Sequence, residues 1–183
     1  MNPSSMPAAG GIDLPSSAWN AFLWRKAVNF WPCIRRSGGR VTHLSTDFTH
    51  AIVRLRLNWR TRNLVGTIFG GAMFASTDPM YMLMLHKIFG RTHVVWDKGC
   101  VARFKRPGRT TLFAEFRLTP EMLANVRDTV AARGEADFTW TIQYKDAAGI
   151  VHAEFDKTIY VAEKSFYKHK LGARAAASSA QAA

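Results

Sequence analysis

The stretch from Asn63 to Leu85, NLVGTIFGGAMFASTDPMYMLML, decides how this chain folds. It opens with three glycines and then becomes almost wholly apolar, apart from one acidic residue, Asp78, which stands directly before Pro79. An apolar run of this length that follows a glycine pair and stops near Gly90 predicts a buried helix. Because proline lacks the N–H group that a helix needs, we expect the helix to bend or restart at Pro79.

The single carboxylate in this helix needs a physical reason. Its neighbours on the same helix face, three and four residues away, are apolar or aromatic: Phe74, Ala75, Tyr81 and Met82. An ionised carboxylate in such surroundings is costly unless it is hydrogen-bonded, paired with a cation or open to a cavity. Asp78 is therefore a candidate functional group. The structural alternative is that it accepts local hydrogen bonds or pairs with Lys98 or an arginine.

The glycines that precede the helix admit three interpretations. A phosphate-binding loop of the P-loop type needs a lysine after the glycines, and a Rossmann loop needs the spacing G-x-G-x-x-G; the chain has neither. The glycines could instead let the helix start pack closely against a strand. They could also leave the free N–H groups of a helix amino terminus pointing at an anion or a developing oxyanion. Spacing alone does not choose between the last two.

Outside this stretch the sequence predicts short strands that are joined mainly by turns. The expected strands cover residues 41–48, 51–59, 93–106, 110–118, 136–144 and 150–162, and further helices cover residues 16–32 and 121–132. Residues 51–59 alternate apolar and polar side chains, the period of a half-buried strand. The order of these elements predicts an α+β fold, in which an antiparallel sheet wraps around the long central helix and an extra helix precedes it.

Composition sets the expected domain limits. Residues 1–15 are rich in Pro, Gly, Ser and Ala, so we expect them to be disordered. Residues 16–163 are expected to form one domain, with the amino-terminal helix at 16–32 and the core at 40–162. Residues 164–183 form a basic tail of small residues that we expect to be frayed. The apolar positions of the amino-terminal helix cover more than half its circumference, which favours packing on the protein over contact with an anionic bilayer.

The net charge limits the kinds of partner that the chain can have. With 25 basic and 13 acidic residues the net charge is +12, which favours nucleic acid, a membrane surface or a phosphorylated ligand. The longest apolar run is interrupted by Asp78 and Pro79, so no membrane span is expected. The two cysteines do not form a metal-binding pair and the six histidines show no ligand spacing. These features predict a cytoplasmic protein without a metal site.

Five residues fit a known pattern in register. Asn63, Gly66, Gly70, Gly71 and Asp78 form N-x-x-G-x-x-x-G-G followed by an acid seven residues after the last glycine. This pattern resembles the hotdog-fold acyl-CoA thioesterases of the phenylacetic-acid-degradation type. The surrounding sequence, with VVWDK and RFKRPG downstream, is more similar to a bacterial hotdog family of unknown function than to these thioesterases. The resemblance covers roughly residues 41–161, including the strand order, and implies a hotdog fold.

The resemblance implies a mechanism and a partner. Asp78 would be the general base or nucleophile in acyl-CoA hydrolysis, the N–H of Gly71 or Gly70 would polarise the thioester carbonyl, and Asn63 would help to place the water. Coenzyme A would enter as part of the substrate, with no separate cofactor. The protein would be a homodimer or a dimer of dimers. The residues themselves leave two roles open for the amino-terminal helix, a lid over the acyl tunnel or contact with a membrane.

One residue departs from the family pattern. Phe69 stands where such thioesterases carry a histidine before the two glycines, so a polar group near the thioester is missing. The same fold would then serve as a non-catalytic acyl-CoA or lipid-binding module, which is the alternative function.

Two basic segments without acidic residues, residues 54–62 and 100–109, could bind the phosphates of coenzyme A, and the candidates lie in the second. The candidate residues are Arg103, Lys105, Arg106 and Arg109. Arg106 and Arg109 flank Pro107-Gly108 at a strand end and fit this role best, whereas solvated strand faces explain basic residues on the strands themselves. Nucleic-acid binding is the competing use of this charge, but no RNA-binding signature such as the RRM motif is present.

Overall fold

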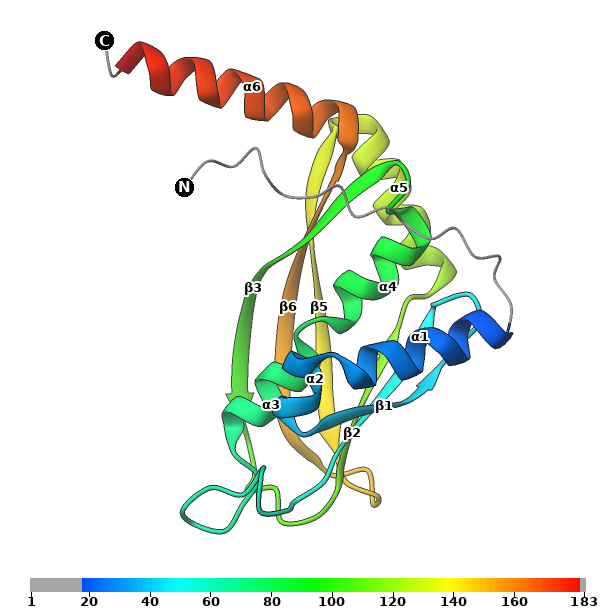
Figure 1. The fold of residues 1–183 in the computed structure, drawn as a ribbon, viewed down its shortest axis with the longest axis vertical. Helices are drawn as coiled ribbons and strands as arrows, with labels where there is room; N and C mark the ends of the chain where they lie inside the picture. Colours follow the sequence, from blue (N-terminus) through cyan, green and yellow to red (C-terminus); the bar gives the residue numbers. More distant parts are fainter. Residues whose placement is uncertain (1–17, 182–183) are drawn as a thin grey trace.

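The computed structural model describes residues 18–181 of the chain. The predicted disordered segment 1–15 lies outside the described residues. Figure 1 shows the elements, whose order is α1 (Ala18–Phe30), α2 (Pro32–Ser37), β1 (Gly39–Leu44), β2 (His50–Leu55), α3 (Gly70–Thr77), α4 (Met80–Phe89), β3 (His93–Phe104), β4 (Leu112–Arg117), α5 (Pro120–Arg133), β5 (Glu135–Lys145), β6 (Val151–Glu163) and α6 (Lys164–Gln181). No helix among the described residues is long and apolar enough to cross a membrane.

The strands form one antiparallel sheet that curves around the central helix. Its six strands lie in the order β1-β2-β4-β5-β6-β3, and every neighbouring pair is antiparallel. Figure 1 shows α3 and α4 against one face of this sheet, with α1 crossing in front of β1. The predicted α+β hotdog architecture, with an additional amino-terminal helix, is confirmed.

The core lies between the sheet and the central helix. Along β4 the residues alternate buried and exposed, so that Leu112, Ala114 and Phe116 all face inward. From the helix side Met84 and Leu85 are fully buried against them. This arrangement follows from the two periodicities of the sequence, two along the strand and 3.6 along the helix. The central helix therefore has a rigid support on its α4 half.

The central helix is broken where the sequence predicts a break. α3 ends at Thr77 and α4 begins at Met80, with Asp78 and Pro79 at the junction. The N–H of Asp78 still donates to the carbonyl of Phe74, at 3.2 Å, and the N–H of Leu83 donates to the carbonyl of Pro79, at 2.9 Å. The break thus leaves two short helices in line and puts Asp78 at the exposed end of the first.

Three expectations at the edges of elements are wrong. The predicted strand 51–59 ends at Leu55, because the hydroxyl of Thr61 donates to the carbonyl of Arg56 at 2.6 Å and folds the following residues into a turn. The predicted first helix ends before Pro32, at Phe30, but no helix was predicted directly after residue 32, whereas Pro32 begins α2 at a position where its missing N–H costs nothing. The carboxyl-terminal tail is a helix, α6, which projects beyond the end of the sheet in Figure 1.

Candidate functional site

The start of α3 presents two free N–H groups. The carbonyl of Phe69 accepts from the N–H of Ala72 at 3.0 Å and of Met73 at 3.3 Å, whereas within residues 18–181 no acceptor binds the N–H of Gly70 or Gly71. Unpaired N–H groups and the helix dipole make such an end attractive to negative charge. The interpretation of these glycines as a bare helix start fits the observed hydrogen bonds.

The two glycines also allow close packing of aromatic rings at the helix start. A Cβ at Gly70 would lie 2.8 Å from the ring of Phe104, and a Cβ at Gly71 would lie 2.3 Å from the ring of Phe69. A methyl group at either glycine would require one of these half-exposed rings to move, so close packing and free N–H groups occur together at the helix start. The ring of Phe69, the residue found where the family pattern has histidine, lies against the helix start.

Asp78 is more exposed than the sequence predicts, and its partner is different. Its side chain is 49% exposed, and its Oδ1 accepts a hydrogen bond from Nζ of Lys157 at 2.7 Å. The expected burial is therefore wrong, and so is the suggested partner Lys98, which pairs with Asp137 on β5. The carboxylate keeps one side open to solvent while a cation fixes the other.

Lys157 is the residue that sequence reasoning missed. It lies on β6 with its side chain only 2% exposed, and its Nζ is also 3.0 Å from Oδ1 of Asp97 on β3. The signal was present in the strand pattern, since Phe155, Lys157 and Ile159 occupy successive inward positions. A lysine in the apolar phase of a buried strand is rare unless it has a charged partner.

The three charges perturb one another. Burial disfavours the ammonium of Lys157, but hydrogen bonds to Asp78 and Asp97 outweigh this effect, and the pKa of Lys157 is raised. Burial raises the pKa of Asp97, although the hydrogen bond and charge of Lys157 act in the opposite direction. Lys157 therefore carries its charge at neutral pH and holds two carboxylates that would otherwise repel each other.

The helix start and Asp78 lie on one face. Seven residues separate Gly71 from Asp78, which is about two helical turns and about 10 Å along the axis. Phe74 lies between them on the same face, and its ring centre is 6.0 Å from Nζ of Lys157. The face thus combines free N–H donors, an aromatic ring and a half-exposed carboxylate, a set that could bind a polar carbonyl beside an apolar chain.

Asn63 closes the loop that leads to α3. Its Oδ1 accepts from the N–H of Thr67 at 2.9 Å, and its Nδ2 donates to the hydroxyl of Thr67 at 2.9 Å. Gly66, inside this loop, has a φ of 79°, which favours glycine. The amide of Asn63 is thus engaged in shaping the approach to the helix start.

The four basic candidates divide into two kinds. Arg103 on β3 pairs with Asp156, and Lys105, directly after β3, pairs with Glu154 at 2.6 Å, so both are neutralised by carboxylates of β6. Arg106 and Arg109 belong instead to the turn between β3 and β4, and Arg106 donates only to the carbonyl of Val151, at 2.9 Å.

The turn that carries Arg106 and Arg109 lies against the loop before α3. The N–H of Ile68 donates to the carbonyl of Gly108 at 2.8 Å, and a Cβ at Gly108 would touch Met73 of α3. The fold therefore brings these two arginines, which are exposed, to the side of the glycine helix start.

Two surface hollows lie elsewhere. One, of about 440 Å³, is lined by Ile52, Phe113, Glu115, Thr141, Gln143 and Lys145, and the other, of about 380 Å³, by Tyr81, Glu115, Arg117, Thr119, Met122, Thr139, Trp140 and Thr141. They form because β4 and β5 pair only at Phe113 and Ala114 and then diverge. Neither hollow includes Asp78 or the glycines.

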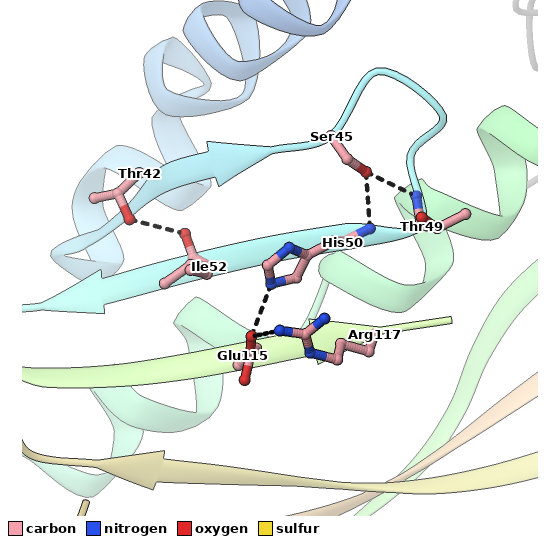
Figure 2. A network of polar contacts seen from close by, with 7 residues as sticks. All are labelled: Thr42, Ser45, Thr49, His50, Ile52, Glu115 and Arg117. Carbon is pink, nitrogen blue, oxygen red and sulfur yellow. Dashed lines mark hydrogen bonds and ion pairs between the residues drawn. The ribbon is translucent and has the colours of Figure 1, made fainter. Parts of the chain in front are cut away.

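The only acid that lines these hollows is already paired. Glu115 Oε1 accepts from Arg117 at 2.6 Å and lies 2.8 Å from Nε2 of His50, as Figure 2 shows. Burial acts to raise its pKa, but the hydrogen bonds from Arg117 and His50 outweigh burial and lower it. The network joins neighbouring strands of the sheet and leaves no free base, so we place the candidate site at Asp78.

Comparison with known proteins agrees with this fold. The family described as "Domain of unknown function (DUF4442)" matches residues 20–161. A Pseudomonas aeruginosa protein of unknown function, described as a "Probable Thioesterase", is 22% identical with a TM-score of 0.66, covering 78% of this chain and 95% of its own. A Haemophilus influenzae thioesterase is 14% identical with a TM-score of 0.59, and the match covers 82% of this chain and 95% of that protein.

A protein of unknown function from Chlorobaculum tepidum is also similar. It is 13% identical with a TM-score of 0.64, and the match covers 79% of this chain and 95% of that protein. No curated protein matches the sequence. At these identities the likeness establishes the hotdog fold.

Proposed function

This chain belongs to the DUF4442 family, and from its fold and site we propose that it hydrolyses acyl-CoA thioesters. The observation that carries the proposal is Asp78, a half-exposed carboxylate on the same helix face as two free N–H groups and held by a buried lysine. Two structural relatives described as thioesterases support it. In this proposal coenzyme A enters as part of the substrate.

In the proposed reaction, the free N–H groups at the start of α3 and the carboxylate of Asp78 at its end have different roles. The N–H of Gly70 or Gly71 would donate to the thioester carbonyl, where negative charge develops as the tetrahedral intermediate forms. Asp78 would take a proton from the attacking water, the water's oxygen would bond to the carbonyl carbon, and the thiolate of coenzyme A would leave. Lys157 acts as a positioning residue, because it holds the carboxylate of Asp78 while its own side chain stays buried.

The spacing favours water as the attacking group. A carbonyl oxygen held about 2.9 Å from the N–H of Gly71 still leaves Asp78 too far for direct attack, since the helix separates them by about 10 Å. One water between the carboxylate and the carbonyl carbon fills this gap. Within one protomer, Asp78 therefore acts as a general base.

A second function has one specific observation in its favour. The ring of Phe69 lies on the helix start, where the family pattern has a polar histidine. An acyl-CoA that bound there would meet an apolar group beside its carbonyl, which suits retention of the ligand more than its turnover. A non-catalytic acyl-CoA-binding protein is therefore the alternative proposal.

One experiment separates the two functions. Purified full-length protein is incubated with acyl-CoA esters from two to sixteen carbons, and free thiol is measured. The thioesterase proposal predicts saturable thiol release for at least one chain length. Saturable acyl-CoA binding by calorimetry without thiol release at any length would support the binding protein and contradict hydrolysis.

We predict that Arg106 and Arg109 determine the affinity for coenzyme A. Replacing both by alanine should raise KM for acyl-CoA about tenfold or more, because each charge-assisted hydrogen bond contributes roughly 1.5–3 kcal/mol. Turnover should stay within about twofold, since neither arginine reaches the carbonyl in this proposal. Steady-state kinetics at low and high salt measures both, and the KM effect should shrink as salt screens the phosphates.

The matched control for these arginines is Lys105→Ala. Lys105 lies on the same segment but is paired with Glu154 at 2.6 Å, so its loss should change KM less than twofold. If Lys105→Ala raised KM as much as the double arginine variant does, general surface charge, and not Arg106 and Arg109 in the turn, would attract the substrate.

We also propose that the protein is a cytoplasmic homodimer. β3 has β6 on one side and no strand on the other within the described residues, and it exposes Trp96, Val101 and Phe104. An edge strand with exposed apolar side chains is a template for pairing with a second copy. The two cysteines are free thiols, which suits a reducing compartment.

The dimer prediction is tested by light scattering. The native protein should have twice the mass of one chain at micromolar concentration, and Val101→Lys should shift it towards the monomer, because lysine at a strand edge opposes pairing. Phe113→Lys, at an exposed position on the inner strand β4, is the control and should leave the mass unchanged. A native monomer would contradict the prediction.

A further inference from the structure

The outward face of α1 is apolar, the reverse of an ordinary surface helix. Trp19 and Phe30 are 69% and 75% exposed, and Phe22 and Leu23 between them are exposed as well. Spacings of three, four and seven residues place these side chains on one side of the helix. We call this set, Trp19, Phe22, Leu23 and Phe30, the α1 stripe.

The orientation of α1 is fixed by polar contacts on its inner side. Nδ2 of Asn29 donates to the carbonyl of Val41, and Oδ1 of Asn29 accepts the N–H of Val41, both at 2.8 Å. Asn20, Ala21 and Val28 are buried on the same side. The helix therefore holds an asparagine against the edge strand β1 and turns its large apolar residues outward, so the stripe is a feature of the fold.

Basic residues flank the stripe, and no acidic residue is present from Ala18 to Ser37. The basic residues are Arg25, Lys26, Arg35 and Arg36; Arg25 donates to the carbonyl of Thr42 at 2.9 Å, and the other three are exposed. Nζ of Lys26 lies 5.4 Å from the ring centre of Phe22, and the guanidinium of Arg35 lies 5.7 Å from that of Phe30. Cations are thus placed beside the aromatic rings, at the level where an apolar surface would meet charged head groups.

The positive charge around the α1 stripe indicates which kind of partner can bind it. A second copy would bring the same four cations against each other with no carboxylate to pair them, which opposes self-association. A single-stranded nucleic acid would stack its bases on aromatic rings. Trp19 and Phe22, however, already stack on each other, with ring centres 5.6 Å apart and planes 5° apart. An anionic lipid surface matches both the apolar stripe and its basic border.

We propose that α1 and α2 bind the protein peripherally to anionic membranes. The α1 stripe enters the boundary between head groups and acyl chains, and the flanking cations contact lipid phosphates. This surface corrects the expectation that the helix packs wholly on the protein, since only one side does so. The proposal is independent of whether the chain hydrolyses thioesters.

The test is co-sedimentation of the full-length protein with large vesicles. Vesicles of phosphatidylcholine with about 30% phosphatidylglycerol should bind the protein, pure phosphatidylcholine should bind it at least tenfold less, and 0.5 M salt should release most of it. Trp19→Ser with Phe30→Ser should lower the partition coefficient about tenfold or more, because two aromatic side chains no longer enter the interface. Lys26→Glu with Arg36→Glu should also abolish binding.

Controls separate the α1 stripe from net charge and from misfolding. Lys168→Glu with Arg174→Glu makes the same change of charge on α6 and should alter binding less than threefold. The Trp19 and Phe30 side chains are exposed, so that double variant should keep its thermal midpoint.

Several results would overturn the proposal. These are an absence of binding to the anionic vesicles, equal losses for the α1 and α6 charge variants, or binding unchanged by loss of Trp19 and Phe30. A change of mass in solution caused by the aromatic double variant, without a change in vesicle binding, would assign the stripe to contact between copies. Retention on single-stranded DNA that depends on the stripe, with no vesicle binding, would assign it to nucleic acid.

Discussion

Asp78→Asn is expected to lower kcat for thioester hydrolysis by about a thousandfold, the range of a lost general base. Asparagine keeps the size of the side chain and still offers a carbonyl oxygen to Lys157, whose Nζ now lies 2.7 Å from Oδ1. KM should change less than threefold, since Asp78 does not contact coenzyme A in the proposal. The measurement is thiol release under steady-state conditions for the chain length that the native protein prefers.

The fold should survive this substitution. The side chain of Asp78 is 49% exposed, so solvent screens its pairing with Lys157 and its loss should shift the thermal midpoint only slightly. Asp137→Asn is the matched control, because Asp137 also pairs with a lysine but lies on β5 outside the site. A native-like rate for Asp78→Asn would remove the assigned mechanism, whereas equal losses for both variants would point to a general effect on structure.

Lys157→Met is expected to lower the free energy of unfolding by about 3 kcal/mol or more, the usual cost of removing one partner from a buried charge cluster. Methionine fits the space, but Asp78 and Asp97 would then face each other without a cation. Urea denaturation at neutral pH measures the change. Lys98→Met, which breaks an exposed lysine–aspartate pair, should cost less than about 1 kcal/mol.

A second substitution separates charge from packing in this variant. Asp97→Asn added to Lys157→Met should restore most of the lost stability, because it removes the partly buried carboxylate left without a partner. If the double variant is no more stable than Lys157→Met alone, the loss comes from packing and the cluster does not act as described.

The pH dependence of stability follows from the directions of the two pKa shifts. Because the pKa of Lys157 is raised from 10.5, its contribution is complete below that value and is lost as the pH rises through the higher folded-state value. The pKa of Asp97 is raised from 3.8, so the folded state binds its proton more readily than the unfolded state does. In Lys157→Met the deficit in stability should therefore shrink on acidification towards pH 4.

The sequence alone predicted the fold through local signals. The glycine pair, the apolar run and Pro79 specified a helix that starts at Gly70 and breaks after Thr77, because each signal acts on the backbone within a turn. The helix predicted over residues 121–132 is likewise observed as α5, which Thr119 caps and which Gly134 ends in a left-handed conformation. Alternation of apolar residues then placed the strands around the helix.

The site depended on pairings that sequence does not reveal. Arg103 meets Glu154 and Asp156 only because β3 and β6 pair in one particular register. The sequence of either strand alone therefore could not predict that these carboxylates neutralise the arginine. The same register brings Asp97 to Lys157. The sequence singled out Asp78 as unusual, but its exposure follows from the break in the helix, and its cation, Lys157, lies 79 residues away in the sequence on β6.

The sequence did not predict the helix α6, because the composition of residues 164–183 is typical of a frayed tail. Its residues are small or basic, which indicated a frayed tail, yet the helix docks through long-range contacts that composition does not show. Lys170 forms an ion pair with Glu135 of β5, and the ring of Phe166 lies where a Cβ of Gly134 would be. Tertiary contacts thus stabilise a helix that begins where the last strand ends.

The most direct test of the proposed site is a crystal structure with a non-hydrolysable acyl-CoA analogue. We predict that its carbonyl oxygen lies about 2.7–3.1 Å from the N–H of Gly70 or Gly71, with Asp78 one water away from the carbonyl carbon. The phosphates should lie beside the turn that carries Arg106 and Arg109. An analogue bound in the outer hollows beside Glu115, with the face between Gly71 and Asp78 empty, would contradict the account.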